Sequence, residues 1–315
     1  MRADIAVVIP LHNKAAHIAA AIESALVQTT GVSEIVIVDD ASTDGSAEIA
    51  RRYAGGRVRL LHRDTPGPGG YAARNFAISA AQAEWIAFLD ADDVWKPDHI
   101  RNLMRMTRRF GEVGCAFSSF ENDFGVQTRP QPIAPLFLTA PQPFDFATFL
   151  RGWLSIRYCP IRTSAAAFRR RVLIEAGLFP AGRASRGGDK DLWLRALRIA
   201  PAVFCAERTM LFNCIADNKV SDGTSTAKVP IICETIAQML AERPSREIAN
   251  LLERLHNQEL RLYARFAFGR ARITPEMKRA VRLPVGWRDW LVLSAMQATP
   301  PAIAAGIRNA KSAPS

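Results

Sequence analysis

The chain has 315 residues, of which 49% are hydrophobic and 23% charged, a composition typical of a globular protein and not of a disordered one. Lys and Arg number 41 against 30 Asp and Glu, so the formal net charge of +11 favours an anionic partner such as nucleic acid, a membrane surface or a phosphorylated substrate. The five cysteines form neither a CxxC pair nor a disulfide framework. Without a signal peptide or a run of about 18 apolar residues, the sequence predicts a cytoplasmic protein with reduced thiols.

Short apolar runs alternate with helical patterns through the first part of the chain. The predicted strands, apolar on both faces, are residues 5–9, 34–38, 58–61 and 85–89. The predicted helices between them cover residues 18–26, 42–53 and 72–83. A β-α-β-α order of this kind predicts a parallel sheet covered by helices, in which ligands bind beyond the carboxyl ends of the strands.

The rest of the chain is less regular. Further strands are predicted at residues 115–120, 164–168 and 203–206, and further helices after Pro97 and at residues 172–176 and 189–199. The stretch 121–143 is rich in Pro and polar residues and is predicted to be a long loop, and beyond Pro230 the pattern is helical and basic. The sequence thus predicts an α/β domain over residues 1–228 and a helical, basic region over residues 229–315.

Acidic residues follow the last of these early strands. Asp90, Asp92 and Asp93 lie directly after a predicted buried strand, where their carboxylates repel one another unless a cation or hydrogen-bond donors lie among them. Oxygen ligands of this kind suit Mg²⁺ or Mn²⁺, which bind one or two carboxylates together with substrate phosphates. The other interpretation is a solvated turn that caps the next helix.

A second polar cluster, residues 39–44, ends the predicted strand at 34–38. A carboxylate at this position can accept a hydrogen bond from a nucleobase, and Ser or Asp can cap the following helix. Taken alone, the cluster fits either role. Because both acidic clusters lie at the carboxyl edge of one predicted sheet, together they predict a nucleotide pocket.

Five motifs in order make the sequence resemble family 2 glycosyltransferases of the GT-A fold. They are residues 6–13 (AVVIPLHN), 35–46 (IVIVDDASTDGS), 73–75 (ARN), 88–93 (FLDADD) and 189–195 (DKDLWLR). Each motif alone is weak, but five in this order are specific, and the resemblance covers roughly residues 4–225. It implies an α/β fold with a Rossmann-like mixed sheet flanked by helices, with the helical carboxyl-terminal region as an appendage.

The resemblance implies a nucleotide-sugar site, position by position. Pro10 and Asn13 would line the nucleotide pocket, and Asp39 would accept a hydrogen bond from uracil N3–H. Arg74 would lie near the diphosphate, and Asp90 would hold the ribose. The donor implied in this way is a UDP-sugar.

The resemblance also implies the reacting groups. Asp92 would ligate a divalent metal, Mn²⁺ or Mg²⁺, and Asp189 would be the catalytic base of an inverting reaction. The chemistry agrees, because a bound metal neutralises charge on the leaving oxygen and the acceptor hydroxyl must lose its proton to a base. Asp191 is the next candidate for the base and otherwise supports the start of its helix. Trp153 is a candidate for stacking on a sugar ring or for packing in the core.

Two positions depart from the family pattern. Gly188 stands where the family usually has a glutamate before the base, a difference that bears on acceptor binding. The histidine that the family often carries near the metal is also missing, because residues 213–219 contain none. Asp217 or Asn218 is the candidate to take its place.

The carboxyl-terminal region carries most of the excess positive charge. Between Arg261 and Arg288 there are eight Lys or Arg and one acidic residue, Glu276. Trp287 and Trp290 lie at the end of this segment. Basic residues beside tryptophans suit an anionic membrane surface, and the other interpretation is a solvated helix face packed on the α/β domain.

Together these features predict an inverting, metal-dependent glycosyltransferase that moves a sugar from a nucleotide-sugar to a glycan or lipid-linked acceptor, in surface polysaccharide synthesis at the cytoplasmic membrane face. One alternative is a degenerate relative that binds nucleotide or glycan without catalysis. Another is a phosphatase of the haloacid dehalogenase type, because residues 90–94 fit DxDx[TV], although that motif normally follows the first strand of its domain. The sequence has no recognised nucleic-acid-binding motif, so we expect no nucleic-acid partner.

Overall fold

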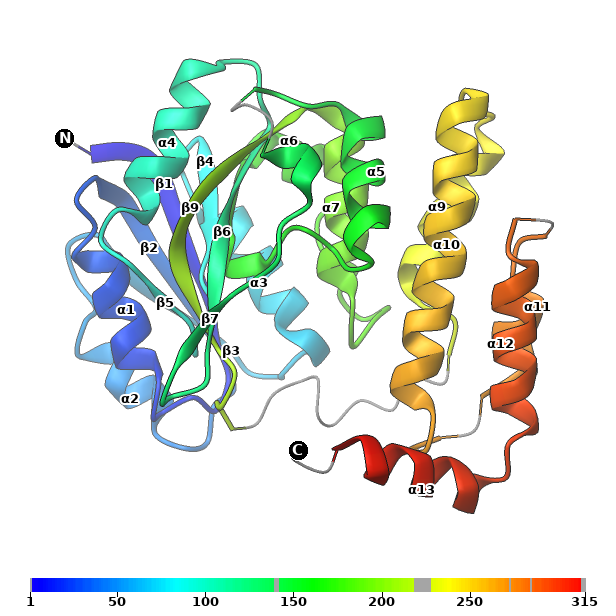
Figure 1. Ribbon diagram of the computed structural model, residues 1–315. Helices are drawn as coiled ribbons and strands as arrows, with labels where there is room; N and C mark the ends of the chain where they lie inside the picture. Colours follow the sequence, from blue (N-terminus) through cyan, green and yellow to red (C-terminus); the bar gives the residue numbers. More distant parts are fainter. Residues whose placement is uncertain (1, 139–141, 218–227, 272, 284, 313–315) are drawn as a thin grey trace.

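The computed structural model describes residues 2–138, 142–217, 228–271, 273–283 and 285–312 (Figure 1). In this part of the chain the strands form one mixed sheet in the order β3-β2-β1-β4-β8-β6-β9-β5, with β7 paired to β6. The strands are β1 (Arg2–Leu11), β2 (Gly31–Asp40), β3 (Val58–Arg63), β4 (Trp85–Phe88), β5 (Val94–Trp95), β6 (Cys115–Asp123), β7 (Thr128–Pro130), β8 (Ala166–Arg169) and β9 (Ala202–Asn213).

Parallel pairing joins the strands that come first in the chain. β1 pairs in parallel with β2 and with β4, and β2 pairs in parallel with β3, which confirms the predicted arrangement. Farther along the sheet, β8 is antiparallel to both β4 and β6. The sheet as a whole is therefore mixed, as the family resemblance implies.

Helices cover both faces of this sheet. They are α1 (Ile18–Leu26), α2 (Ser46–Arg51), α3 (Tyr71–Ala80), α4 (His99–Arg109), α5 (Phe146–Ile156), α6 (Arg170–Glu175) and α7 (Gly188–Ile199). Alternate residues of β1 enter different cores, Ile5 and Val7 on the side of α1 and α4, and Ala6 and Val8 on the side of α3, α5 and α7. Because successive side chains of a strand point to opposite faces, a doubly covered strand needs an unbroken apolar run.

The stretch 121–143 is more ordered than predicted. β6 runs on to Asp123 by continuing to pair with β9, and β7 then pairs back on β6, so the prediction of one long loop is wrong for these residues. Residues 139–141 lie outside the described part of the chain. Helix α5, which the sequence analysis did not predict, begins after Asp145, whose carboxylate accepts a hydrogen bond from the backbone N–H of Thr148.

Beyond β9 the described chain is helical, as expected. Its helices are α9 (Ile231–Ala241), α10 (Arg246–Ala267), α11 (Pro275–Arg279), α12 (Trp287–Ala298) and α13 (Pro301–Ser312). α9 packs on α7 and α10 packs on α5, and Ile236, Leu252 and Leu255 belong to the same core as the sheet. α12 packs on α10, and α13 lies at the lower edge of Figure 1. No single helix in the described ranges is long and apolar enough to cross a membrane. Trp287–Ala298 and Ala302–Arg308 reach the required length and apolar composition only when taken together, and this pair is bent by 114°.

The register of the sheet fixes where its polar ends lie. Leu11 pairs with Asp39, and Val8 pairs with Phe88, so β1, β2 and β4 leave the sheet at the same edge, toward the bottom of Figure 1. The polar clusters that follow these strands therefore share one rim, as the sequence predicts.

Candidate functional site

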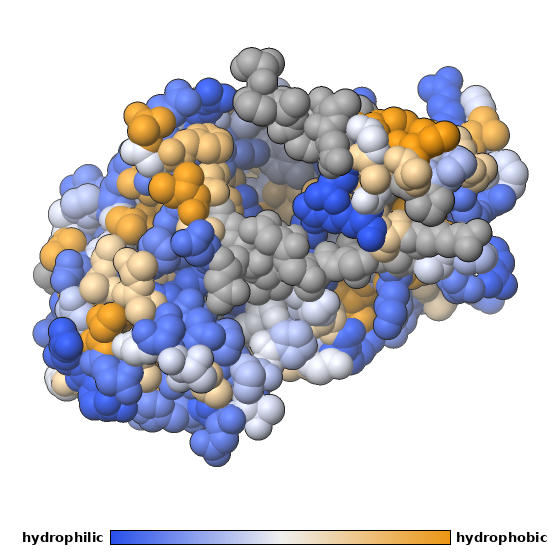
Figure 2. Space-filling model, turned by 90° about the horizontal axis from the view of Figure 1, so that it is seen from below, coloured by the Kyte–Doolittle hydropathy of each residue, from blue (hydrophilic) through white to orange (hydrophobic). Residues whose placement is uncertain are grey.

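A cleft of about 670 Å³ opens at this edge of the sheet. Its walls come from the ends of β1 and β4, from residues 66–70 and from residues 185–189 around the start of α7. Figure 2, which views the molecule from below, shows this face hollowed, with hydrophilic side chains beside the hollow. The predicted site residues that line the cleft are Pro10, Arg74, Asp90, Asp92 and Asp189.

Two carboxylates of the cluster after β4 form ion pairs at the cleft. Arg74 reaches Asp90 from α3, with 2.5 Å between the guanidinium nitrogen and the carboxylate oxygen, and Lys14 reaches Asp92 from the loop after β1 at 2.8 Å. Arg74 also donates to the carbonyl of Gly69 at 2.8 Å, which ties α3 to the loop before it. The arginine and the aspartate predicted to hold the diphosphate and ribose are thus paired with each other.

The third carboxylate, Asp93, is buried and holds the loop together. It accepts hydrogen bonds from the hydroxyl of Ser164 at 2.5 Å and from the backbone N–H of Asn213 at 3.0 Å. Burial, with added repulsion from Asp90 and Asp92, raises the pKa of Asp93 to about 8. Asp93 therefore fixes the direction of its two neighbours, a role that the sequence did not separate from theirs.

The donor set at this end of the cleft fits a divalent metal. Asp90 and Asp92 supply carboxylate oxygens, and a cation, the ammonium group of Lys14, already lies against Asp92. Among the described residues no three His, Cys, Asp or Glu side chains converge as a complete metal site. Two carboxylates would suit Mg²⁺ or Mn²⁺, which take one or two carboxylates and complete their coordination with substrate phosphates and water.

The end of β2 is a hydrogen-bonded hub next to the cleft. Asp39 is 6% exposed; it accepts from the backbone N–H of Ser42 at 3.2 Å and lies 3.3 Å from His62 Nδ1. The Asn13 side-chain oxygen accepts from Thr43 N–H at 2.8 Å. Asn13 and Asp39 therefore fasten the loop after β2 beside the cleft and are not among the residues that line it.

Asp40, the neighbour of Asp39, does line the cleft. It pairs with Arg63 and accepts a hydrogen bond from the backbone N–H of Gly67 at 3.0 Å. This contact holds the glycine-rich loop 66–70 at the cleft wall. Gly70 has φ +65°, and a side chain there would press on Arg74 at 3.1 Å, so the loop needs glycine at this close approach.

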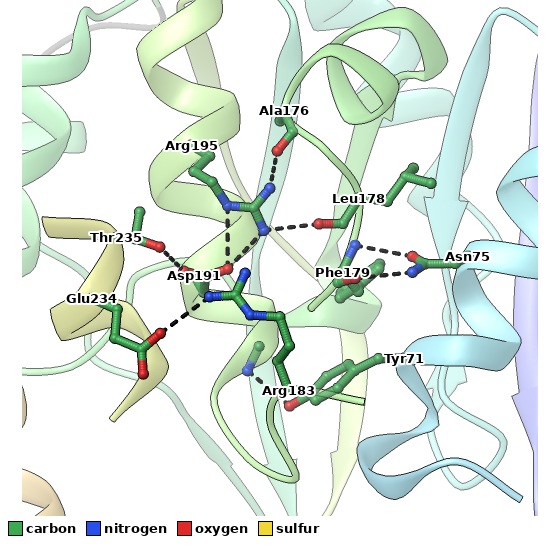
Figure 3. Close-up of polar contacts among 11 residues, drawn as sticks. Tyr71, Asn75, Ala176, Leu178, Phe179, Arg183, Asp191, Arg195, Glu234 and Thr235 are labelled. Carbon is green, nitrogen blue, oxygen red and sulfur yellow. Dashed lines mark hydrogen bonds and ion pairs between the residues drawn. The ribbon is translucent and has the colours of Figure 1, made fainter. Parts of the chain in front are cut away.

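Asp189 lies in the first turn of α7, after Gly187 in the left-handed conformation (φ +75°). It is half-buried and lines the cleft, and its carboxylate makes no hydrogen bond or ion pair within the described ranges. Asp191, by contrast, faces away from the cleft and is 2% exposed. It pairs with Arg195 at 2.7 Å and accepts from the hydroxyl of Thr235 on α9 (Figure 3). Asp191 thus supports α7.

Tyr71 occupies the space beside Gly188. The backbone N–H of Gly188 donates to the Tyr71 hydroxyl at 2.8 Å, and a side chain at this position would meet the Tyr71 ring at 2.7 Å and Pro180 at 2.9 Å. Tyr71 stacks on Phe179, with 5.7 Å between ring centres. Burial, and next the Asp189 carboxylate, raise the pKa of Tyr71 above its usual value, so its hydroxyl stays protonated. Tyr71 and Pro180 therefore fill the space that a glutamate side chain at position 188 would need.

Helix α10 backs this wall of the cleft. Lys190 Nζ lies 2.9 Å from an oxygen of Glu259, which is completely buried. Burial favours the neutral amine, yet the Glu259 carboxylate outweighs it and raises the pKa of Lys190. Tyr263, one turn farther on, has its ring 5.6 Å from the same ammonium group. The sequence analysis missed this contribution; the polar run 256–259 inside an apolar helix was its only local signal.

Two other candidates take positions that differ from those expected. Trp153 on α5 is completely buried and packs against Phe149, with 5.5 Å between ring centres, so it packs in the core and has no face open to a sugar. Asp217, a candidate to replace the missing histidine, accepts a hydrogen bond from Lys14 Nζ through its backbone carbonyl, at 2.7 Å. Asn218, the other candidate, lies outside the described residues.

Sequence comparison gives a family and several relatives. The family model described as Glycosyl transferase family 2 matches residues 6–177. The succinoglycan biosynthesis protein ExoU of Rhizobium meliloti (strain 1021) is 29% identical over 268 residues, which are 82% of this chain and 75% of that protein. ExoO of the same organism, also a succinoglycan biosynthesis protein, is 43% identical over 102 residues, which are 32% of this chain. This match spans 29% of ExoO, and matches to further curated relatives span roughly a third of their length.

Solved structures resemble the whole chain in fold. S. aureus TarS 1-349, in complex with UDP-GlcNAc, superimposes with a TM-score of 0.70 at 15% identity, over 97% of this chain and 92% of that one. The mannosyltransferase PcManGT from Pyrobaculum calidifontis, in complex with GDP-Man and Mn²⁺, gives a TM-score of 0.59 at 17% identity, over 98% and 87%. These likenesses confirm the predicted GT-A fold.

Proposed function

This chain belongs to glycosyl transferase family 2, and on that premise we propose that it transfers a sugar from a nucleotide-sugar donor to an acceptor hydroxyl with inversion at the anomeric carbon. One observation carries the proposal: a single cleft is lined by the carboxylates of Asp90 and Asp92 and by that of Asp189, which has no partner among the residues that the structure describes. A haloacid dehalogenase phosphatase does not fit, because the chain has another family's motifs and the cluster follows the fourth strand.

The donor we propose is a UDP-sugar. Pro10 lines the cleft, with Asp39 and Asn13 beside it in the hub at the end of β2. We propose that Asp39, which lies beside the cleft and is 6% exposed, accepts a hydrogen bond from a base N–H when the donor is bound. The binding of UDP-GlcNAc by TarS, which has this fold, supports a uridine nucleotide; the GDP-Man complex of PcManGT makes a guanine nucleotide the other outcome of a donor screen.

Asp92, with Asp90 beside it, would hold a divalent metal together with the donor phosphates. When bound, such a metal neutralises charge on the departing diphosphate. With a metal on Asp92, the ammonium group of Lys14 would be displaced from this carboxylate and could contact a phosphate oxygen. Arg74, held by Asp90 and the Gly69 carbonyl, presents a fixed cation to the same part of the cleft.

Asp189 is the proposed base. A carboxylate without a fixed partner can take the proton of the acceptor hydroxyl as that oxygen attacks the anomeric carbon. The new carbon–oxygen bond forms as the bond to the diphosphate oxygen breaks, and the proton passes to Asp189. A single displacement needs no covalent sugar–enzyme intermediate. The intact Asp92 and Asp189 argue against a degenerate binding protein, and Gly188 does not favour one because Tyr71 fills the space beside it.

The acceptor we propose is a glycan or lipid-linked sugar in the synthesis of a surface polysaccharide. The names of ExoU and ExoO, both succinoglycan biosynthesis proteins, support this assignment. A screen of nucleotide-sugars for Mn²⁺-dependent release of nucleoside diphosphate tests the donor. Binding and turnover of one donor are expected, and a chain that neither binds nor turns over any nucleotide-sugar would contradict the proposal.

We also propose that α12 and α13 contact the cytoplasmic membrane face. Trp287 and Trp290 are 54% and 37% exposed, and cations lie over both rings, Arg288 at 5.1 Å and Lys278 at 4.5 Å. The exposed apolar side chains on and beside these helices are Leu283, Val285, Leu291, Val292, Ile303 and Ile307. Basic residues with tryptophans and apolar side chains suit an anionic interface. In Figure 1 α13 lies at the lower edge, toward which β1, β2 and β4 also end, so this contact would bring a lipid-linked acceptor near the cleft.

The structure narrows the membrane segment that the sequence indicates. Arg261 pairs with Asp289 at 2.6 Å, and Tyr263, Ala264 and Ala267 of α10 are buried, so a truncation at residue 261 would cut the core. The test is co-sedimentation with phosphatidylglycerol and phosphatidylcholine vesicles of a variant carrying Trp287→Ser and Trp290→Ser, with the exposed Val126→Ser as control. Loss of anionic-vesicle binding in the double variant alone is expected; equal pelleting of all three proteins would contradict the membrane contact.

A further inference from the structure

We propose that the cleft contains a second anion site, centred on Arg186, which binds a phosphate or carboxylate group of the acceptor. This inference rests on the proposed function for the word acceptor, and it goes beyond that function by naming the acceptor's chemistry. The acceptor is a sugar that carries an oxyanion close to its attacking hydroxyl, as a sugar phosphate or a uronic acid does.

The cations that line the cleft fall into two kinds. Lys14 and Arg74 each have a carboxylate partner, at 2.8 and 2.5 Å. Arg162 and Arg186 also line the cleft, and within the described ranges neither makes an ion pair or hydrogen bond through its side chain. Two uncompensated guanidinium groups in one cleft attract anions, because low-dielectric walls strengthen the field of each charge.

Each of these arginines is held by an aromatic ring. The Arg186 guanidinium carbon lies 4.2 Å from the centre of the Phe266 ring, and that of Arg162 lies 3.8 Å from the centre of the Phe212 ring. A guanidinium stacked on a ring keeps its N–H groups at the edge, where they can grip an oxyanion with two parallel hydrogen bonds. The ring also limits the rotamers of the arginine, so less entropy is lost when the anion binds.

The positions of the two arginines assign them to different ligands. Arg162 is two residues from Ser164, whose hydroxyl accepts from Asp90 N–H at 3.0 Å and donates to Asp93. Arg162 therefore belongs to the part of the cleft whose carboxylates are proposed to hold the donor and its metal. Arg186 precedes Asp189 by three residues in the loop that leads into α7. An oxyanion on Arg186 would thus belong to the molecule whose hydroxyl faces the base.

Helix α10 connects this site to the carboxyl-terminal region. Phe266 is 39% exposed, and Tyr263 on the same helix lies edge-on to it, with 6.4 Å between ring centres. Burial raises the pKa of Tyr263, and the nearby Arg186 guanidinium works against this rise. The helices after the sheet would then shape acceptor choice directly, in addition to any membrane contact made by α12 and α13.

The experiment titrates matched sugars into the full chain. Glucose 1-phosphate and glucuronic acid are the anionic probes, and methyl glucoside is the neutral one. Each is titrated into the protein alone and into protein saturated with Mg²⁺ and the best-binding nucleoside diphosphate, and binding is followed by ligand-observed NMR. Filling the donor site first separates an acceptor oxyanion from one that merely enters the diphosphate site.

The expected result is that the nucleotide-saturated protein binds the anionic probes at least about tenfold more tightly than methyl glucoside, as charge-assisted hydrogen bonds would give. Arg186→Gln should abolish this preference and change nucleoside diphosphate affinity less than twofold. Arg162→Gln should do the reverse. Phe266→Leu, which keeps the charge and loses the ring, should fall in between. Arg183→Gln is the matched control, because Arg183 is exposed and pairs with Glu234 outside the cleft.

Two results would overturn the anion site. One is equal binding of charged and neutral sugars by the wild-type protein; the other is an Arg186→Gln variant that keeps the preference or loses nucleoside diphosphate affinity tenfold. Failure of the wild type to bind any nucleoside diphosphate is a separate result. It contradicts the proposed function, while the titrations without nucleotide still show whether Arg186 binds oxyanions.

Discussion

The two walls of the cleft differ in how their charges are compensated. The sheet wall is formed by the ends of β1, β2 and β4 and by residues 66–74, and the helix wall by residues 185–190 with α10 behind them. The lining carboxylates of the sheet wall all have cationic partners: Asp40 with Arg63, Asp90 with Arg74 and Asp92 with Lys14. On the helix wall, neither Asp189 nor Arg186 has an ion-pair partner of opposite charge within the described ranges.

The two walls therefore differ in what ligand binding requires: ion pairs must open on the sheet wall, whereas the side chains of the helix wall can bind without breaking one. If Asp90 and Asp92 hold the donor and its metal as proposed, these ligands would have to displace an internal cation on the sheet wall, and part of their binding free energy would replace contacts that already exist. The helix wall presents the Asp189 carboxylate and the Arg186 guanidinium, neither of which is paired within the described ranges. The ion pair between Lys190 and the buried Glu259 of α10 holds this wall in place. The sheet wall suits reversible donor binding, and the helix wall suits a pre-positioned base.

The largest effect is expected at the free carboxylate of the helix wall. Asp189→Asn should lower the transfer rate by about 10²–10⁴-fold, the usual contribution of a positioned base. Nucleoside diphosphate affinity should stay within about twofold, because the sheet wall is unchanged. Initial rates with saturating donor, together with calorimetric nucleotide titration, measure both quantities.

The control for this change is Asp191→Asn on the same helix. Asp191 is buried against Arg195 and Thr235, so its loss should lower stability more than it lowers the rate per folded molecule. A normal rate in Asp189→Asn combined with a dead but folded Asp191→Asn would move the base to Asp191 and undo the contrast between the walls.

The support behind the helix wall comes next. Glu259→Gln leaves the Lys190 ammonium in a buried place without its counter-charge, and breaking such a pair by removing one partner costs about 3–5 kcal/mol. We expect a loss of this size in the free energy of unfolding, read from urea denaturation. Glu253→Gln, on the same helix without an ion pair in the described structure, should change stability little. Equal effects of the two changes would show that α10 does not hold the wall through this pair.

Local sequence predicted that Asp90 and Asp92 lie at the rim of the sheet wall, whereas Asn13 and Asp39, expected to line the pocket, lie beside the cleft. An apolar run that ends in Asp90 or Asp39 places a carboxylate at the edge of a parallel sheet, and the register of β1 with its two neighbours brings those ends together. The pairing of Arg74 with Asp90 needed the structure, because α3 must first be laid across the sheet.

The helix wall was only half predictable. Asp189 follows from its motif, but Glu259 lies 69 residues beyond Lys190 in the chain and belongs to no motif. A glutamate on an amphipathic helix normally faces water, so its complete burial depends on tertiary packing. For the same reason, the number of Lys and Arg residues between positions 261 and 288 could not show that the end of α10 is packed against the core while α12 is exposed.

A buried histidine on α10 makes the stability of this support depend on pH. Burial, and next the nearby Arg282, lower the pKa of His256 to about 4 from its ordinary value of 6.5. As pH falls from 6.5 toward 4, the unfolded chain takes up this proton and the folded chain does not, so stability is lost across that window, by roughly 3 kcal/mol in total. His256→Gln should flatten this part of the curve of unfolding free energy against pH. If the variant and the wild type lost the same unfolding free energy between pH 6.5 and 4, the pH dependence could not be assigned to His256.

On the sheet wall, Asp92→Asn should remove the metal-dependent part of donor binding, because a neutral amide is a poor ligand for a hard dication. We expect nucleoside diphosphate affinity with Mn²⁺ to fall about tenfold, a loss of about 1.4 kcal/mol, and affinity without metal to change little. Calorimetric titrations in Mn²⁺ and in EDTA measure the two terms. A variant that kept the full metal effect would place the metal on Asp90 instead.

The smallest effect is expected at Lys14, and it has the opposite sign. Its ammonium group lies 2.8 Å from Asp92, so a metal must displace it before using that oxygen. Lys14→Gln removes this competing cation, and the affinity of the protein for Mn²⁺ alone should rise by a few-fold, since a partly exposed ion pair contributes less than about 1 kcal/mol. Nucleoside diphosphate affinity in the presence of Mn²⁺ should rise less, or fall, because the freed lysine would otherwise contact a phosphate. Electron paramagnetic resonance of free Mn²⁺ measures the metal affinity without any turnover. A lower affinity for Mn²⁺ alone in the variant would mean that Lys14 positions Asp92 and does not compete for it, and the sheet wall would then be as ready for its ligand as the helix wall.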